Sequence, residues 1–330
     1  MSVKALGDFS KIPGTDGAEH LVKAINISGA KDIIDQYGFD FGKRFGGGFF
    51  SDVFQVQSKI WSDKELLLKI VDYDRCSNKL NYHSELNITK FFRNNSHFNL
   101  LYIFKLIEFE RLQFWILFEK FGIILEKFVL SFENGFPLFN SKYIFKQLVN
   151  VVQFIHNHRI VHRDISDTNI LIDPDKLQIK LIDFGFGKKV SDEFLIEKDK
   201  ILCFSNKGTF QYMAPELLHE RSYDKLFYDG IKVDIYSMGV VLFFLTHQTY
   251  PFKYDDNDDN DDDDDVDDNN SKKPDFEKLV NGYYRLKNIP KVISEPETVY
   301  ELLINQLLVP NPDDRPTLLE VEKHKFFQDN

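Results

Sequence analysis

The chain contains very few cysteines: Cys76 and Cys203 are the two among 330 residues. They are far apart and form no C-x-x-C pair, which excludes a disulfide framework and the usual spacings of a zinc site. Long uninterrupted apolar runs are also missing, and a run such as 239–245 is far too short to cross a bilayer. The first residues lack the continuous apolar stretch of a secretory signal. We therefore expect an intracellular protein, cytoplasmic or nuclear, without a membrane span.

Basic residues are not in excess either. The chain has 41 Lys and Arg against 52 Asp and Glu, which gives a formal net charge of −11. Residues 255–268 include 11 Asp and no basic residue, so the remaining 41 acidic residues balance the 41 basic ones. A balanced surface argues against nucleic-acid binding, which needs a basic face. The Asp/Asn-rich stretch 255–270 is expected to be a solvated, disordered insert, and docking of a basic partner is the alternative.

Apolar residues are plentiful, at 43% of the chain, and the 33 Phe predict a core rich in aromatic rings. Strand-like runs lie at 37–45, 53–59, 65–71, 103–109 and 114–119. One helix is expected among them, at 81–93. This part of the sequence therefore predicts a small sheet that carries one helix.

The pattern changes after Gly122. Helical spacing of apolar residues is clearest at 141–157, and two short strands follow at 170–172 and 179–182. Further helices are predicted at 233–246, 275–281, 298–308 and 317–323.

Together these patterns predict an α+β protein with two lobes. A small mostly-β lobe is expected at 37–121 and a larger mostly-α lobe at 122–328, after an N-terminal extension at 1–36. Clefts between lobes are favoured positions for ligands, so a binding site is expected there.

A glycine-rich stretch lies between the first two strand-like runs. It reads Phe45-Gly-Gly-Gly-Phe-Phe-Ser-Asp-Val53. Glycines allow the backbone to approach phosphate groups without a Cβ in the way. Glycine-rich hairpins are common, however, so this motif alone is weak.

Lys69 stands inside the apolar run 66–70. A lysine in a buried strand is costly unless it is paired, and Glu85 on the following helix is the expected partner. A surface lysine is the alternative interpretation, which the apolar neighbours disfavour.

Two further motifs contain candidate metal and proton-transfer groups. His162-Arg163-Asp164 is followed by Asn169, and a carboxylate and an amide five residues apart in a loop can face one site. Asp183-Phe-Gly places a second carboxylate beside a flexible glycine, which suits a metal ligand.

The order of these motifs, completed by Gly208-Thr209 through Ala214-Pro-Glu216, resembles the eukaryotic protein kinases. The resemblance runs from about residue 37 to about residue 327 and implies the bilobal protein kinase fold. It further implies a serine/threonine kinase that transfers the γ-phosphate of ATP, with Mg²⁺, to protein substrates. A pseudokinase that acts as a scaffold and a small-molecule kinase of related fold are the alternatives.

The resemblance also implies roles for individual residues. Asp164 would accept or orient the substrate hydroxyl, and Lys69, held by Glu85, would bind the α- and β-phosphates. Asn169 and Asp183 would hold Mg²⁺. The remaining nucleotide contacts would come from Phe45, Gly46, Gly47, Gly48, Phe49, Phe50, Ser51, Asp52, Val53, Glu119, Phe121 and Leu171.

Two further matches are structural. Glu216 and Arg315 resemble the ion pair that braces the activation segment. Asp234 resembles the helix residue that holds the backbone of the catalytic loop. Ser205, three residues before Gly208, is a candidate for phosphorylation by an upstream kinase, with Arg163 as the residue that would pair with the phosphate.

Ser51 replaces the third glycine of the loop, where a small residue is tolerated, and three further positions depart from the family pattern. Ser166 stands where serine/threonine kinases usually have a lysine that touches the γ-phosphate. Leu67 replaces the usual alanine above adenine. Thr89 replaces the apolar layer expected in the stack that would align the lobes, whose other three layers would be His162, Phe184 and Leu106. These departures keep the pseudokinase alternative open.

Overall fold

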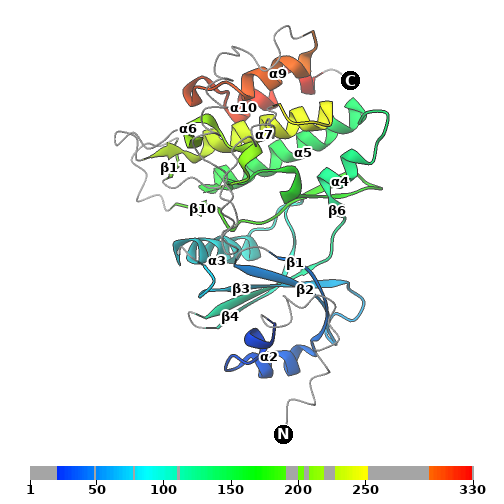
Figure 1. Ribbon diagram of the computed structural model, residues 1–330, viewed down its shortest axis with the longest axis vertical. Helices are drawn as coiled ribbons and strands as arrows, with labels where there is room; N and C mark the ends of the chain where they lie inside the picture. Colours follow the sequence, from blue (N-terminus) through cyan, green and yellow to red (C-terminus); the bar gives the residue numbers. More distant parts are fainter. Residues whose placement is uncertain are drawn as a thin grey trace, which may run out of the picture. The chain divides into compact units, whose positions relative to one another are not determined.

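The computed structural model describes residues 21–47, 50–76, 79–109, 112–190, 200–203, 208–218, 227–251 and 297–328. The chain divides into two compact units (Figure 1). The first comprises Met1–Gly122 and Ile182–Lys189, and the second comprises Ile123–Leu181 and Val190–Asn330. The predicted α+β class is confirmed, because the first unit is built on a sheet and the second on helices.

The first unit contains an antiparallel five-stranded sheet in the order β1-β2-β3-β5-β4. Its strands are β1 (Asp40–Gly47), β2 (Ser51–Gln57), β3 (Leu66–Asp72), β4 (Ile103–Phe109) and β5 (Gln113–Glu119), with helix α3 (Lys79–Asn94) after β3 and the short β10 (Lys188–Lys189). Strand β3 is central and is buried on both faces, which explains its unbroken run of apolar residues around Lys69.

The segment that precedes β1 belongs to the core of this unit. Residues 21–25 are helical, and α2 (Ala30–Tyr37) follows them. Leu21 and Ala30 are fully buried in one cluster with sheet residues such as Trp115. Residues 21–36, predicted as an extension, thus contribute core side chains. The strand predicted from residue 37 begins at Asp40, because α2 ends at Gly38 in the left-handed region (φ 60°).

The second unit is mostly helical, as predicted. Its helices are α4 (Leu125–Leu130), α5 (Leu138–Asn157), α6 (Pro215–Leu218), α7 (Gly230–His247), α9 (Val299–Leu307) and α10 (Leu318–Glu322). Its strands are β6 (Ile123–Ile124), β7 (Ile160–Val161), β8 (Ile170–Asp173), β9 (Gln178–Leu181), β11 (Leu202–Cys203) and β12 (Tyr228–Asp229). Single 3-10 turns are η3 (Asp167–Asn169), η5 (Phe210–Tyr212), η6 (Pro312–Asp314) and η7 (Lys325–Phe327).

Side-chain caps define where two helices of the second unit begin. Thr298 caps α9 through a reciprocal pair with Glu301, and Thr317 caps α10 in the same way with Glu320. Each cap satisfies backbone N–H groups that a helix start would otherwise leave unpaired. The helix predicted at 275–281 lies outside the described residues.

Helix α7 is long and apolar enough to cross a membrane by length and composition, with a mean hydropathy of 1.2. A search for uninterrupted apolar runs does not find this helix, because Lys232, Asp234 and Ser237 interrupt its apolar sequence. Inside the fold, 78% of this window is buried, and α7 packs on α5 (Figure 1). A central position in the second unit accounts for its apolar character.

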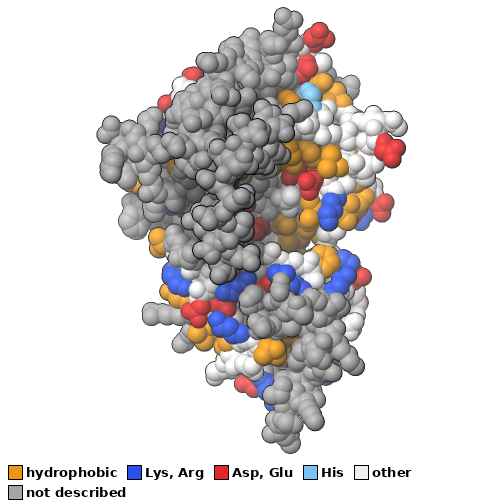
Figure 2. Space-filling model, in the orientation of Figure 1, with side chains coloured by type: hydrophobic (Ala, Val, Ile, Leu, Met, Phe, Trp, Pro, Cys, Tyr) orange, Lys and Arg blue, Asp and Glu red, His pale blue; other side chains and the backbone are white. Residues whose placement is uncertain are grey.

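Charged side chains are distributed without a single dominant sign. Figure 2 shows Lys and Arg mixed with Asp and Glu among the described residues of the visible face. This agrees with the balanced count outside the acidic run. That run, 255–270, lies outside the described residues.

Candidate active site

Lys69 lies in an ionic group of the first unit. It projects from β3, and its Nζ lies 2.7 Å from Glu85 Oε1 on α3 and 3.0 Å from Asp183 Oδ1. The Lys69 and Glu85 side chains are 12% and 3% exposed, whereas Asp183 is 50% exposed. The predicted Lys69–Glu85 pair is therefore present, and Asp183 joins it.

Burial and charge act in opposite directions on this group. Burial alone would lower the pKa of Lys69, but attraction by Asp183 and Glu85 outweighs burial and raises that pKa. Burial raises the pKa of the Glu85 carboxyl, and Lys69 opposes that shift. Lys69 therefore remains a cation at neutral pH, as a ligand for phosphate oxygens must.

The described residues of the glycine-rich stretch lie at the end of β1, which closes at Gly47, and at the start of β2, which begins at Ser51. A Cβ added to Gly47 would come within 2.8 Å of Arg44, Ser51 and Asp52 atoms, whereas one added to Gly46 would meet open space. Gly47 is thus required by the packing of the hairpin itself. Gly48 and Phe49 lie outside the described residues.

Asp52 has a bracing function that the sequence did not reveal. Its side chain is 2% exposed and accepts hydrogen bonds from Arg44 of β1, at 2.9 Å, and from Arg75. The Asp52 carboxylate is thus engaged by two guanidinium groups, which stabilise the hairpin. A nucleotide contact from this residue would have to come from its backbone.

The segment that begins with Asp183 packs against α3 and the hairpin. The rings of Phe184 and Phe92 meet edge to face, with their centres 4.8 Å apart. Ser84 Oγ donates a hydrogen bond to Gly187 O at 2.8 Å. The ring of Phe50 lies about 3.1 Å from where a Cβ on Gly185 would be, so this glycine cannot be substituted without displacement.

Phe92 supplies packing that the sequence interpretation missed. It lies one turn beyond Thr89 on α3, and residues three apart share a helix face. The Thr89 hydroxyl donates to Glu85 O at 2.8 Å, one turn earlier on the same helix. A search of the same helix face could have identified Phe92.

The other predicted nucleotide residues of this unit surround the same strands. Val53 pairs with both Gly46 and Lys69 in the sheet. Glu119 ends β5 and forms a surface ion pair with Lys64 at 3.3 Å. Phe45, Phe50, Ser51 and Phe121 lie on or beside the hairpin and the end of β5.

Asp164 is the centre of a second group of site residues, which belongs to the second unit. Its Oδ1 accepts hydrogen bonds from Thr209 N, at 2.6 Å, and from Thr209 Oγ1, at 2.8 Å. Asn169 Nδ2 donates to Asp164 Oδ2 at 2.8 Å and to Asp164 O at 2.9 Å. Because the amide nitrogen of Asn169 is used in this way, its carbonyl oxygen is the atom available for a metal ion.

The backbone before Asp164 is held by Asp234 of α7, which is fully buried. Asp234 accepts from His162 N at 2.9 Å, from Arg163 N at 2.8 Å and from His156 Nε2 at 2.8 Å. Arg163 lies in the left-handed region, with φ 66°. The role predicted for Asp234 is confirmed by these contacts.

Glu216 and Arg315 also form the predicted pair. Two parallel hydrogen bonds of 2.7 Å join the guanidinium to the carboxylate. The guanidinium also lies 4.9 Å from the centre of the Tyr236 ring and donates to nearby carbonyl oxygens. The pair thus ties α6 to the segment between α9 and α10.

Leu171 and Ser166 both belong to the second unit. Leu171 lies in β8 and pairs with Ile124 of β6. Ser166 is fully buried, and its hydroxyl lies 3.0 Å from Thr168 Oγ1. A short buried hydroxyl cannot replace the long cation that the family usually has at this position.

Each unit by itself presents groups whose chemistry fits Mg²⁺ or phosphate. In the first unit, Asp183 presents a half-exposed carboxylate beside the cation of Lys69, and in the second unit Asn169 presents an amide oxygen. Hard oxygen ligands of this kind are those that Mg²⁺ prefers. No group of three or more His, Cys, Asp and Glu side chains that could hold a metal ion occurs among the described residues.

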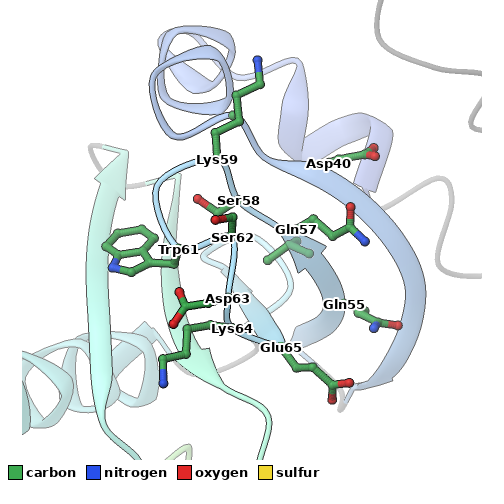
Figure 3. A pocket seen from close by; sticks show the side chains of 12 residues that line it. Asp40, Gln55, Gln57, Ser58, Lys59, Trp61, Ser62, Asp63, Lys64 and Glu65 are labelled. Atoms are coloured by element: carbon green, nitrogen blue, oxygen red, sulfur yellow. The ribbon is translucent and has the colours of Figure 1, made fainter.

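A separate cavity of about 610 Å³ lies in the first unit, beside the loop that joins β2 and β3. It is lined mainly by polar side chains such as Asp40, Gln57 and Asp63, with Trp61 beside them (Figure 3). None of the predicted site residues lines this cavity, so it is not part of the candidate active site.

Comparison with known families agrees with this geometry. A family model described as "Protein kinase domain" matches residues 39–327. The chain is a member of the protein kinase family. The family implies ATP and a divalent metal ion in general terms, and the fold and motif order of this kinase domain agree with that membership.

Similar proteins carry serine/threonine kinase names. "Probable serine/threonine-protein kinase fhkA" of Dictyostelium discoideum is 28% identical over 339 aligned positions, which cover 90% of this chain. "CBL-interacting serine/threonine-protein kinase 13" of Arabidopsis thaliana is 29% identical, also over 90% of this chain. The kinase domain spans about half the length of these relatives, 51% and 52% respectively.

Proposed function

We propose that this kinase domain transfers the γ-phosphate of ATP to serine or threonine hydroxyl groups of protein substrates. The observation that carries the proposal is the fixed position of Asp164 between Thr209 and Asn169. The ionic group around Lys69 supports it, because a held cation is what phosphate oxygens require. The serine/threonine names of the relatives point in the same direction.

Each residue has a defined task in this proposal. Asp164 accepts the proton of the substrate hydroxyl or orients that hydroxyl, and Lys69 binds phosphate oxygens. Asn169 and Asp183 would hold Mg²⁺, which neutralises charge on the phosphate oxygens when it is bound. The chain's own contribution is therefore to position groups and to supply fixed charge.

Thr209 favours hydroxyl acceptors of serine and threonine. Its side chain touches the carboxylate of Asp164, and this contact is typical of the serine/threonine group. The segment 208–216 that contains it also suits polypeptide substrates better than small molecules.

Ser166 predicts a slow enzyme. Losing one preorganised electrostatic contact typically costs about 10²- to 10³-fold in rate. Kinase turnover is commonly about 1–100 s⁻¹, so an uncompensated loss would still leave measurable transfer. Lys207, the candidate for compensation, lies outside the described residues.

A scaffold without catalysis is the alternative function. Ser166, Leu67 and Thr89 are the features that favour it. The presence of Lys69 and Asp164 in their hydrogen-bonded arrangements, together with Asn169 and Asp183, weighs against it.

The test is a transfer assay with labelled ATP, Mg²⁺ and a library of peptides. We expect transfer by the wild-type chain, little transfer by Asp164→Asn, and normal transfer by Asp173→Asn, a matched change on β8 in the same unit. Phosphoamino-acid analysis should find phosphoserine or phosphothreonine. Equal activity of wild type and Asp164→Asn would contradict the proposed reaction, and phosphotyrosine alone would contradict the acceptor type.

Two regulatory proposals concern residues outside the described part of the chain. Phosphorylation of Ser205 by an upstream kinase would raise activity, since Arg163 carries the charge that could pair with the phosphate. Unchanged turnover of Ser205→Ala would contradict this. Deletion of the acidic run 255–270 should leave peptide phosphorylation intact if the run is only a solvated insert. Docking of a basic partner is the alternative, and loss of capture of a lysine-rich peptide by the deletion variant would support it.

A further inference from the structure

Three side chains of the second unit form a hydrogen-bonded group beside the catalytic loop. Asp167 begins η3, Tyr212 ends η5, and Tyr250 follows α7. Tyr250 Oη donates to Asp167 Oδ2 at 2.9 Å, and Asp167 N–H donates to Tyr212 Oη at 3.3 Å. Asp167 is 1% exposed and Tyr212 is 3% exposed, so these contacts are made away from water.

The group repeats a contact that is already part of the candidate active site. Asp164 is held by Thr209, and Asp167 is held by Tyr212. In each segment the second residue lies three positions after the first. The catalytic loop and the segment that begins at Thr209 are therefore joined at two matched places. One of the two places carries the proton-accepting carboxylate, and the other does not.

The two phenol groups are themselves fixed by α7. Tyr250 stacks on Phe244 with ring centres 5.3 Å apart and meets Tyr212 edge-on at 5.8 Å. The carbonyl of Tyr212 accepts a hydrogen bond from Ser237 Oγ at 2.9 Å. The hydroxyl groups therefore meet Asp167 from side chains with little freedom to move.

A buried carboxylate is retained only where hydrogen bonds replace its hydration, because an unsatisfied one is strongly unfavourable. The position of Asp167 thus depends on Tyr250 and Tyr212. Asn169 lies in the same 3-10 turn, and its N–H donates to Ser166 O at 3.1 Å. A displacement of this turn would move Asn169 away from Asp164.

We propose that Asp167, Tyr212 and Tyr250 are positioning residues, which fix η3 and thereby hold Asn169 against Asp164. This inference rests on the proposed kinase function for its effect on rate. The three residues would stabilise the catalytic loop at η3, the turn that directly follows Ser166. Ser166 is the position where the usual lysine is missing.

The first test removes one hydroxyl group. Tyr250→Phe keeps the ring stacked on Phe244 and deletes the hydrogen bond to Asp167. We expect the backbone amides of Asp167 and Asn169 to exchange with deuterium about tenfold faster than in the wild type. Tyr143→Phe, a change at an exposed tyrosine of α5, should leave their exchange unchanged.

The second test separates positioning from stability. In Tyr250→Phe, kcat should fall about 10-fold while KM for ATP stays within about twofold, because the loss affects alignment and not nucleotide binding. Asp167→Asn keeps an oxygen that can accept from Tyr250 and should restore most of the kcat that Asp167→Ala loses. If Tyr250→Phe fails to fold, this second pair of variants gives the same comparison.

The possible outcomes are distinct. Unchanged amide exchange in Tyr250→Phe would overturn the inference, and so would faster exchange with an unchanged kcat, since the group would then be merely structural. A wild-type chain that transfers no phosphate would count against the proposed function instead. In that case the exchange measurement alone would decide whether the group fixes the loop.

Discussion

The two units hold their key carboxylates in different ways. In the first unit, Asp183 is half exposed and lies beside the ammonium group of Lys69, which Glu85 also contacts. In the second unit, Asp164 is held by a hydroxyl, a backbone N–H and an amide from Thr209 and Asn169, all of them neutral donors. One group is an ionic cluster, and the other is a set of directional hydrogen bonds.

The difference follows from what each group must do. A cation that binds phosphate needs opposite charge to keep it in place, since burial alone would discharge it. A carboxylate that accepts a proton is better held by neutral donors, because a directly paired cation would make it a weaker proton acceptor. The comparison suggests that the first unit supplies charge and the second supplies alignment.

The largest effect is expected from breaking the alignment in the second unit. Asp164→Asn keeps the shape of the side chain but removes its capacity to accept a proton, so kcat should fall by about 10²- to 10⁴-fold. Steady-state kinetics and a thermal melt measure this together. A thermal midpoint close to that of the wild type is expected, and a large loss of stability would mean that Asp164 is structural.

The ion pair of the second unit should matter for stability and not for chemistry. Glu216→Gln leaves the buried guanidinium of Arg315 without its counter-charge, which should cost about 3 kcal/mol of unfolding free energy. Urea unfolding gives this value, with Glu322→Gln on the exposed side of α10 as the control. A stable variant that has lost activity would contradict the division between bracing and catalysis.

A smaller effect is expected from weakening the ionic cluster of the first unit. Glu85→Gln removes one of the two carboxylates at Lys69, and a charged hydrogen bond contributes about 1.5–3 kcal/mol. We expect kcat/KM for ATP to fall by about 10- to 100-fold, while Glu108→Gln, which breaks a surface pair with Lys90, has no effect. If Glu85→Gln matched Glu108→Gln, Asp183 alone would be sufficient to hold Lys69.

The smallest expected effect is a pH dependence of stability. It comes from His324, which belongs neither to the Lys69 group nor to the Asp164 group. Burial, followed by repulsion from Lys325, lowers the pKa of His324, whose Nδ1 accepts from Phe326 N at 3.2 Å. The neutral ring therefore stabilises the fold above the ordinary pKa of 6.5, and this contribution is lost as pH falls through the lowered value.

We therefore expect the wild type to lose slightly more thermal stability than His324→Asn between pH 7.5 and pH 5, about a degree in midpoint. Melts at the two pH values check this. A wild type that gains stability on acidification relative to the variant would show that the sign is wrong.

Local pattern was sufficient to predict the strands and helices that carry the motifs. The Lys69–Glu85 pair followed from the cost of an unpaired lysine in an apolar strand, whereas the Asp234 contacts and the Glu216–Arg315 pair followed from the resemblance to the protein kinases. The predicted ends of helices and strands differ from the observed ends by a few residues. The helix expected at 81–93, for example, is found at Lys79–Asn94. Caps and tertiary packing set such ends, and local pattern does not contain them.

Contacts between distant residues without a motif could not be predicted. Asp52 of β2 meets Arg44 because of the register of β1 against β2, and it meets Arg75 because the turn after β3 lies beside it. A one-residue shift in register would separate Asp52 from Arg44. The Asp167–Tyr250 bond joins residues 83 positions apart. No periodicity in a single sequence encodes such a distance.

The buried segment at 21–37 has a practical consequence for anyone who expresses this domain. The family match begins at residue 39, so a recombinant protein cut at that point would lose Leu21, Ala30 and Ile34. The sheet face that these residues cover would then be exposed to solvent as a wide apolar surface, which favours self-association. A start before residue 21 should give soluble protein where the shorter chain aggregates.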